Sequence, residues 1–180
     1  DIAHGKYCPT DIANPEVNQR RSDIMIGDKP LHEYVPLYFA PKNPMSSKRR
    51  DSKLAILHVD REVIRKPNVI FTDGNAASSY TNFFNDINDL DKLDWKCLKA
   101  QYWSDFIDGT RKRCAEVLVP HEINLNYIKE ISVKNERIRN ELIEFLPVND
   151  EEYDDEKEFR TSIDDTFYGI PLKVTPDFFF

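Results

Sequence analysis

The segment RKRCAEVLVP, residues Arg111–Pro120, places a basic run directly before an apolar one. A short apolar run that ends at a proline is typical of a buried β-strand, because proline cannot donate the next hydrogen bond of the ladder. Glu116 interrupts this apolar run. A buried carboxylate is costly unless it is paired, hydrogen-bonded or directed into a cleft. Two interpretations follow: Glu116 lies on the solvent face of an amphipathic strand, or it is held inside for a chemical purpose.

The composition is typical of an ordered globular protein. The chain has 180 residues, of which 40% are hydrophobic and 32% are charged, and no stretch approaches the length of a membrane-spanning helix. We therefore expect a single domain, residues 1–180, with no membrane partner. The three cysteines lack CxxC spacing, which favours free thiols in a reducing cytoplasm.

The charge is distributed unevenly. The net charge of −7 disfavours non-specific binding to polyanions. Much of the acid is concentrated in DEEYDDEKE, residues 150–158, whereas residues 47–50 and 111–113 form basic patches. Local binding of phosphate groups therefore remains compatible with the sequence.

Strand and helix patterns alternate along the chain, which indicates an α+β fold. Helices are expected at Pro15–Arg21, where the preceding Asn14 has the chemistry of an N-cap, and at 134–146, where an apolar stripe ends before Pro147. Between 78 and 103 the spacing of aromatic residues predicts two short helices with a break near 89–94. Apolar and β-branched runs predict strands at 34–41, 53–60, 68–73, 115–120 and 127–133, and an edge strand within 169–180.

Several familiar site types are missing from the sequence. The chain has five glycines and neither a GxxxxGK[ST] nor a GxGxxG motif, so it lacks the usual phosphate-binding loops. The four histidines are spread singly, so no metal site is expected. The candidates that remain are polar residues in apolar or turn-like segments: Arg20, Arg21, Asp73, Asn75 and Glu116. Locally, the arginines also fit a helix C-terminus, and Asn75 also fits a turn.

Five blocks of the chain together resemble one known family. They are NPEVNQRR (14–21), LHEYVPLYFAPKNPM (31–45), VIFTDGNAASSYTNFFNDINDLDKLDW (69–95), RKRCAEVLVP (111–120) and VTPDFFF (174–180). In order and spacing they resemble the DarT toxins, which are DNA ADP-ribosyltransferases of bacterial toxin–antitoxin pairs. The resemblance implies an ADP-ribosyltransferase-like fold, in which two small β-sheets pack around a cleft that holds NAD as the substrate, without a metal.

The resemblance also assigns roles to individual residues. Glu116 corresponds to the catalytic glutamate of the family. Such a carboxylate suits the reaction because breaking the bond between nicotinamide and ribose develops positive charge on the sugar. A key arginine falls on Arg21, with Arg20 as the alternative register. Tyr38 and Met45 are expected near the nicotinamide half of NAD.

The substrate side is expected between Asn75 and Arg113. Many relatives carry a histidine where this chain has Asn75, a position implied to handle NAD or the target base. Tyr80 and Trp103 are candidates to stack on bases of single-stranded DNA, while Lys112 and Arg113 are candidates to contact its phosphates. The resemblance further implies a macrodomain-type antitoxin as the protein partner.

One family feature is missing from the sequence. Relatives begin with an NAD-binding block resembling YHxTHxxNLxxILxxG, and residues 1–30 contain nothing similar. Two expectations therefore stay open. Either further residues complete the NAD pocket, or the chain is a DarT-like module that binds nucleic acid or a partner without catalysis.

Overall fold

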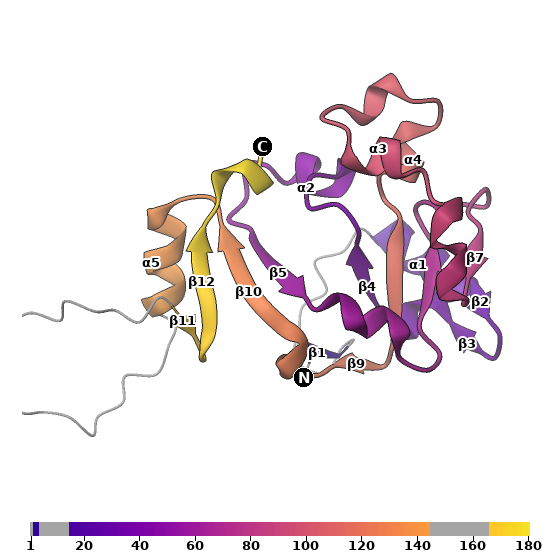
Figure 1. The fold of residues 1–180 in the computed structure, drawn as a ribbon, viewed down its shortest axis with the longest axis horizontal. Coiled ribbons are helices and arrows are strands. Elements are labelled where there is room, and N and C mark those ends of the chain that lie inside the picture. Colours follow the sequence, from indigo (N-terminus) through magenta and orange to yellow (C-terminus); the bar gives the residue numbers. More distant parts are fainter. Residues whose placement is uncertain (1, 4–14, 145–165) are drawn as a thin grey trace, which may run out of the picture.

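Two four-stranded β-sheets form the framework of the molecule (Figure 1). We describe it from a computed structural model that covers residues 2–3, 15–144 and 166–180. The first sheet consists, in spatial order, of β4 (Tyr34–Tyr38), β8 (Glu116–Pro120), β6 (Ile70–Thr72) and β7 (Phe83–Phe84). The second consists of β11 (Thr166–Phe167), β12 (Ile170–Val174), β10 (Ile128–Val133) and β5 (Ala55–Val59). The α+β class predicted from the sequence is confirmed.

β8 lies inside the first sheet, antiparallel to both β4 and β6. Its two faces are both covered. Val117 and Val119 belong to the main apolar cluster, whereas Leu118 packs in a second cluster with Leu31 and Tyr34. A strand that is buried on both faces reads as a continuous apolar run, which is the pattern that this segment shows. Glu116 therefore has no solvent face to occupy, and the interpretation of a solvated strand residue is wrong.

The second sheet mixes parallel and antiparallel pairing. β10 is antiparallel to β5 and parallel to β12, and β12 forms an antiparallel hairpin with β11. The prediction of a final edge strand is therefore wrong, because β12 lies between β10 and β11. The helix α5 (Glu136–Glu144) lies between β10 and β12 in the sequence and packs on both strands (Figure 1).

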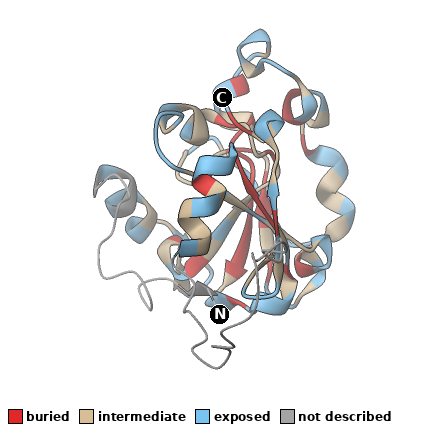
Figure 2. Cartoon of the chain, turned by 90° about the vertical axis from the view of Figure 1, so that its left-hand side faces the viewer, coloured by how far each residue is buried: buried red, intermediate tan, exposed pale blue. Residues whose placement is uncertain are grey.

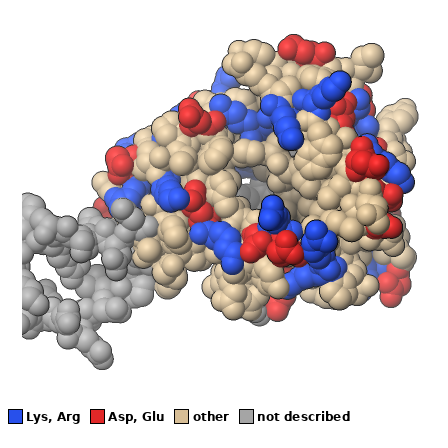
Figure 3. All heavy atoms as spheres, in the orientation of Figure 1, with Lys and Arg blue, Asp and Glu red and all other residues tan. Residues whose placement is uncertain are grey.

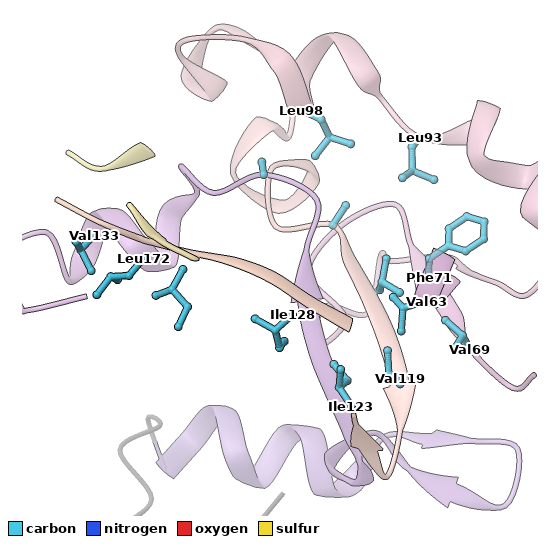
Figure 4. Packing of buried hydrophobic residues seen from close by; sticks show 14 of the residues in the cluster. Val63, Val69, Phe71, Leu93, Leu98, Val119, Ile123, Ile128, Val133 and Leu172 are labelled. Carbon is cyan, nitrogen blue, oxygen red and sulfur yellow. The ribbon is translucent and has the colours of Figure 1, made fainter. Parts of the chain in front are cut away.

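One cluster of buried apolar side chains runs through both sheets. Figure 4 shows Val119 and Ile123 beside Ile128, while Val133 and Leu172 continue the cluster into the second sheet. Figure 2 shows the same arrangement as buried strands surrounded by exposed helices and loops. The buried strands therefore give the molecule a rigid interior on which polar groups can be held.

The helices are short. α1 (Pro15–Asp23) begins at the predicted proline, and Asn14, its expected cap, lies outside the described residues. The remaining α-helices are α2 (Pro44–Lys48), α3 (Trp95–Lys99) and α4 (Gly109–Lys112). The 3-10 helices are η1 (Leu31–Glu33), η2 (Arg61–Arg65), η3 (Ile87–Lys92), η4 (Trp103–Asp105), η5 (Leu125–Tyr127) and η6 (Pro176–Phe178). Two further strand pairs are β1 (Ile2–Ala3) with β9 (Glu122–Ile123), and β2 (Met25–Ile26) with β3 (Lys29–Pro30).

The segment 78–103 departs from its prediction. The two expected helices are replaced by strand β7, the 3-10 helix η3 and the α-helix α3. Phe83 and Phe84 pair with Thr72 and Phe71 of β6, and the rings of Phe84 and Phe71 stack. This pairing with a strand outside the segment outweighs the local spacing of the aromatic residues.

The surface carries both signs of charge. On the face seen in Figure 3, Lys and Arg side chains lie around a narrow central hollow and alternate with Asp and Glu. No helix within 15–144 or 166–180 is long and apolar enough to cross a bilayer. The net negative charge thus coexists with local cationic positions.

Candidate active site

Glu116 is a fully buried carboxylate at the first position of β8. It is 1% exposed, and its backbone N–H donates to Thr72 Oγ1 on β6 at 3.0 Å. The Thr72 hydroxyl donates in turn to the carbonyl oxygen of Gly74 at 2.7 Å. The start of β8 is therefore fixed to the end of β6 by side-chain as well as ladder hydrogen bonds. A catalytic group on such a strand is positioned more rigidly than one on a loop.

Arg21 of α1 forms an ion pair with this carboxylate. Its Nη1 donates to Glu116 Oε2 at 3.1 Å, and the two side chains are 14% and 2% exposed. Arg20, the alternative register, is exposed. Burying a carboxylate is tolerated when a charged partner satisfies it, so Arg21 is one reason that the acid can lie inside the sheet.

The second oxygen of Glu116 is held by the backbone. Ala76 donates its N–H to Glu116 Oε1 at 3.0 Å. Ala76 lies in the segment between β6 and β7, residues 73–82, which we call the 73–82 loop. Both oxygens of the carboxylate therefore have fixed donors from two different segments, which restricts its rotation. This contact cannot be predicted from residue types, since every residue except proline carries the same backbone donor.

Burial governs the protonation of the site. It raises the pKa of Glu116 above its ordinary value, and the charge of Arg21 and the hydrogen bond from Ala76 only partly offset it. Tyr38 lies opposite Glu116 in the register of β4 and β8. Burial and then the charge of Glu116 raise the pKa of Tyr38 strongly, so its phenol remains a donor. Burial, with Glu116 nearby, also raises the pKa of the Cys114 thiol to about 11, which disfavours a thiolate nucleophile.

One donor of the site is available for a ligand. Arg21 Nη2 is buried and has no hydrogen-bond partner among the described residues. Because buried donors are almost always paired, we expect a bound ligand to supply a hydrogen-bond acceptor for this nitrogen. A guanidinium suits the oxygens of a pyrophosphate or of a pyrimidine base, because it presents planar, forked donors. The donor set therefore fits NAD or its acceptor base, as the family resemblance implies.

Asn75 and Met45 lie beside this constellation. Asn75 precedes Ala76, and its side-chain oxygen accepts from the N–H of Ala77 at 2.9 Å, so it stabilises the 73–82 loop internally. Met45 is at the start of α2, is 43% exposed, and its backbone N–H lies against the Cys114 thiol as well as Asn43 Oδ1. The structure thus brings Arg21, Tyr38, Asn75 and Glu116 together. Met45 is connected to them only indirectly, through the contact of its backbone N–H with Cys114.

The four residues expected to contact DNA have different surroundings. Tyr80 is 83% exposed on the 73–82 loop, which leaves its ring open to a base. Trp103 is partly buried and packs edge-on against Phe180. Lys112 Nζ is ion-paired to Asp94 Oδ2 at 3.0 Å. The aromatic and basic residues of this segment therefore do not form one open surface.

Arg113 has a structural role instead of the expected phosphate contact. Its side chain is buried, and it donates to the carbonyl oxygens of Lys42 at 2.6 Å, Cys97 at 2.9 Å, Leu98 at 2.7 Å and Ala100 at 2.8 Å. The guanidinium also lies over the ring of Trp103. With these donors engaged, Arg113 joins α3 to the loop before α2 and is not free to meet DNA.

The described residues contain no cluster of candidate metal ligands. Within 2–3, 15–144 and 166–180, no three His, Cys, Asp or Glu side chains are grouped as a metal site requires. Cys97 and Cys114 are buried free thiols, while Cys8 lies outside the described residues.

Sequence comparisons give the site its context. A family model described as "ssDNA thymidine ADP-ribosyltransferase, DarT" matches residues 2–180. The DNA ADP-ribosyl transferase of Thermus sp. (strain 2.9) is 30% identical over 161 residues, which cover 81% of this chain and 77% of that protein. A DNA ADP-ribosyl transferase-DNA ADP-ribosyl glycohydrolase fusion protein of Thermosipho africanus (strain H17ap60334) is 30% identical over 142 residues, covering 75% of this chain and 36% of the fusion.

Solved structures show the same fold. The structure of Thermus sp. 2.9 DarT in complex with ADP-ribosylated ssDNA matches with a TM-score of 0.76 at 23% identity, covering 100% of this chain and 87% of that one. Thermosipho africanus DarTG in complex with ADP-ribose matches with a TM-score of 0.72 at 25% identity, covering 94% of this chain and 42% of that one. The two-sheet ADP-ribosyltransferase-like architecture expected from the sequence is thereby confirmed.

Proposed function

The chain belongs to the DarT family of single-stranded DNA ADP-ribosyltransferases, and we propose that it transfers ADP-ribose from NAD to a thymidine base with Glu116 and Arg21 at the reacting centre. The observation that carries this proposal is the buried ion pair between these two side chains. A carboxylate inside an apolar strand, with a paired arginine that has a further donor to offer, is an expensive arrangement for stability alone.

The carboxylate has two tasks in this reaction. The bond between the ribose C1′ and the nicotinamide nitrogen breaks, its electron pair leaves with nicotinamide, and positive charge spreads over C1′ and the ring oxygen. The negative Glu116 stabilises that charge. A ring nitrogen of the base then forms the new bond to C1′, and Glu116 accepts the proton that this nitrogen loses. The raised pKa suits this second task, because a base is most effective when its pKa approaches the working pH.

Arg21 and Tyr38 position the substrates. Arg21 Nη2 is the donor for a pyrophosphate oxygen of NAD or for a carbonyl oxygen of the base, while Nη1 keeps Glu116 in place. Tyr38, protonated and opposite Glu116, supplies an O–H donor near the nicotinamide half, where Met45 provides an apolar contact. Tyr80 stacks on a base of the single strand.

The family context supports a role for this activity in a toxin–antitoxin pair. The Thermosipho relative is named as a fusion of a DNA ADP-ribosyl transferase with a DNA ADP-ribosyl glycohydrolase, a combination of opposing activities. We assign this chain the toxin part, which modifies DNA in the cytoplasm and blocks replication. A macrodomain-type antitoxin that removes the modification is its partner.

The proposal is tested by transfer of label from NAD. The purified protein is incubated with NAD labelled in the ADP-ribose half and with two single-stranded oligonucleotides, one containing thymidine and a matched one without it. We expect label on the thymidine oligonucleotide alone, with release of nicotinamide, and loss of both in Glu116→Gln. Label on protein would indicate a protein-modifying transferase, and label on neither would support a non-catalytic binding module.

A further inference from the structure

Arg111 of α4 contacts the 73–82 loop, the segment that supplies the Ala76 N–H to Glu116. Its Nη1 donates to Asp73 Oδ1 at 2.7 Å and to Thr81 Oγ1 at 3.1 Å, at the two ends of the loop. Its backbone carbonyl accepts from the N–H of Asn75 at 3.0 Å, immediately before Ala76. One residue therefore ties the beginning, the middle and the end of the loop to α4.

Gly74 allows this close approach. A Cβ placed on Gly74 would lie 2.3 Å from Arg111 Nη1 and 2.9 Å from Arg111 Cγ, so any larger residue would displace the guanidinium. Gly74 also receives the hydrogen bond of Thr72, the residue that fixes the backbone of Glu116. The arginine is thus packed against the backbone that connects β6 to the site.

Arg111 is itself held in place. Its Nε donates to Asp108 Oδ2 at 2.5 Å, and its side chain is only 14% exposed. Asp73, its other acidic partner, also accepts from the backbone and side chain of Asn82. An arginine bracketed by two carboxylates in a partly buried position has little freedom to move. It can therefore transmit the position of α4 to the 73–82 loop.

We propose that Arg111 is a positioning residue for Glu116, which acts by holding the 73–82 loop so that the Ala76 N–H stays bonded to Glu116 Oε1. The inference rests on the proposed function of Glu116 and extends it to a residue that does not touch the carboxylate. Without this loop contact, Glu116 would keep Arg21 as a partner on one oxygen only and could rotate about its terminal bond.

The loss of Ala76 as a donor has a consequence that a simple loss of stability lacks. The charged groups and titratable groups around Glu116 are Arg21 from α1, Tyr38 from β4 and Cys114 before β8. All of these remain when the loop shifts, whereas the hydrogen bond from Ala76, which favours the ionised carboxylate, is lost. The pKa of Glu116 then rises further, and the acidic limb of kcat against pH moves to higher pH.

Two variants disturb this contact from opposite sides. Arg111→Met removes the guanidinium, and Gly74→Ala displaces it while leaving its charge. In both we expect a loss in kcat on the order of 100-fold, little change in KM for NAD, and an acidic limb at higher pH than in the unaltered protein. Arg65→Met serves as the control, because Arg65 pairs with Glu62 within η2, outside the 73–82 loop.

The outcomes separate this inference from the proposed function. Suppose that Glu116→Gln is inactive, but Arg111→Met and Gly74→Ala keep the kcat and the acidic limb of the pH profile of the unaltered protein. Arg111 then has no positioning role, and the inference is overturned. If Glu116→Gln retains full activity, the proposed function fails first. Should Arg111→Met not fold, as judged by its far-UV circular dichroism, Gly74→Ala alone decides.

Discussion

Glu116 and Arg21 are 95 positions apart in the sequence, and their side chains meet at 3.1 Å at the start of β8. Arg21 fits the last turn of the polar helix α1, but a carboxylate does not fit the apolar strand β8. Each supplies what the other requires, because a buried charge is stable only beside an opposite one. The pair therefore accounts for the acid within an apolar run.

The two neighbouring arginines of α1 give a matched test of this pair. Arg21→Ala removes the partner of Glu116 and the unpaired Nη2, and we expect a loss in kcat/KM on the order of 100-fold or more. Arg20→Ala changes an exposed side chain and should keep most of the activity. Steady-state transfer rates with NAD and a thymidine oligonucleotide decide between them. A larger defect in Arg20→Ala would show that the reacting geometry uses the other register.

The raised pKa of Glu116 predicts how stability changes with pH. A carboxyl group whose pKa is higher in the folded state binds a proton more readily there, so its contribution to stability is complete below the unfolded pKa and is lost as pH rises through the folded pKa. Glu116→Gln cannot titrate. The free energy of unfolding of the unaltered protein, minus that of Glu116→Gln, should therefore fall as pH rises from the acidic range.

Urea denaturation of both proteins across a pH series measures this difference directly. Any constant cost of leaving Arg21 without its ionic partner cancels, because only the slope with pH is compared. A flat difference would mean that folding leaves the pKa unchanged, and a rising one that the ion pair with Arg21 outweighs burial.

Arg113 is predicted to matter for folding rather than for DNA contact. Arg113→Met removes this donor from the carbonyls at Lys42, Leu98 and Ala100, whereas the carbonyl of Cys97 keeps the N–H of Ala100. An unpaired buried polar group costs about 1–3 kcal/mol. Because three such carbonyls are affected, we expect the free energy of unfolding to fall by about 3 kcal/mol or more. The variant Lys112→Met at the adjacent position loses only a partly exposed ion pair. Its free energy of unfolding should fall by about 1 kcal/mol or less. Equal losses in the two variants would contradict the assignment.

Tyr80 is predicted to bind the DNA strand. Because its ring is 83% exposed, Tyr80→Ala should leave the free energy of unfolding unchanged. Stacking of a base on an aromatic ring contributes about 1–3 kcal/mol, so the KM for the oligonucleotide should rise roughly 5- to 150-fold while the KM for NAD stays constant. Tyr80→Phe keeps the ring and should behave as the unaltered protein. An unchanged KM in Tyr80→Ala would exclude stacking at this position.

The sequence predicted the elements whose patterns are local. β4, β5, β6, β8 and β10 were found from apolar or β-branched runs, and α1 from a proline at its first position. The failures depend on distant partners. β7 exists because Phe83 and Phe84 pair with β6, and β12 is an inner strand because β11 covers its other side. Residue spacing within a segment carries no information about which strand lies beside it.

The site divides in the same way. Glu116 can be predicted from the sequence because its residue type conflicts with its apolar surroundings, whereas the role of Arg21 is implied only by the family resemblance. The Ala76 donor and the role of Arg111 were not predicted, because a backbone N–H has no residue-type signal and the basic run 111–113 reads as a phosphate-binding patch. The single available signal was Gly74, one of only five glycines, placed directly after Asp73.

The parallel pairing of β10 with β12 has a consequence for synthesis on the ribosome. β5 and β10 can pair once Ile128–Val133 has left the exit tunnel, but the other edge of β10 stays open until Ile170–Val174 has followed. An open edge of this kind exposes unpaired backbone groups and can recruit other chains. A nascent chain that stops before that point therefore carries an incomplete sheet with an unpaired edge. We expect chaperones or proteases to recognise it.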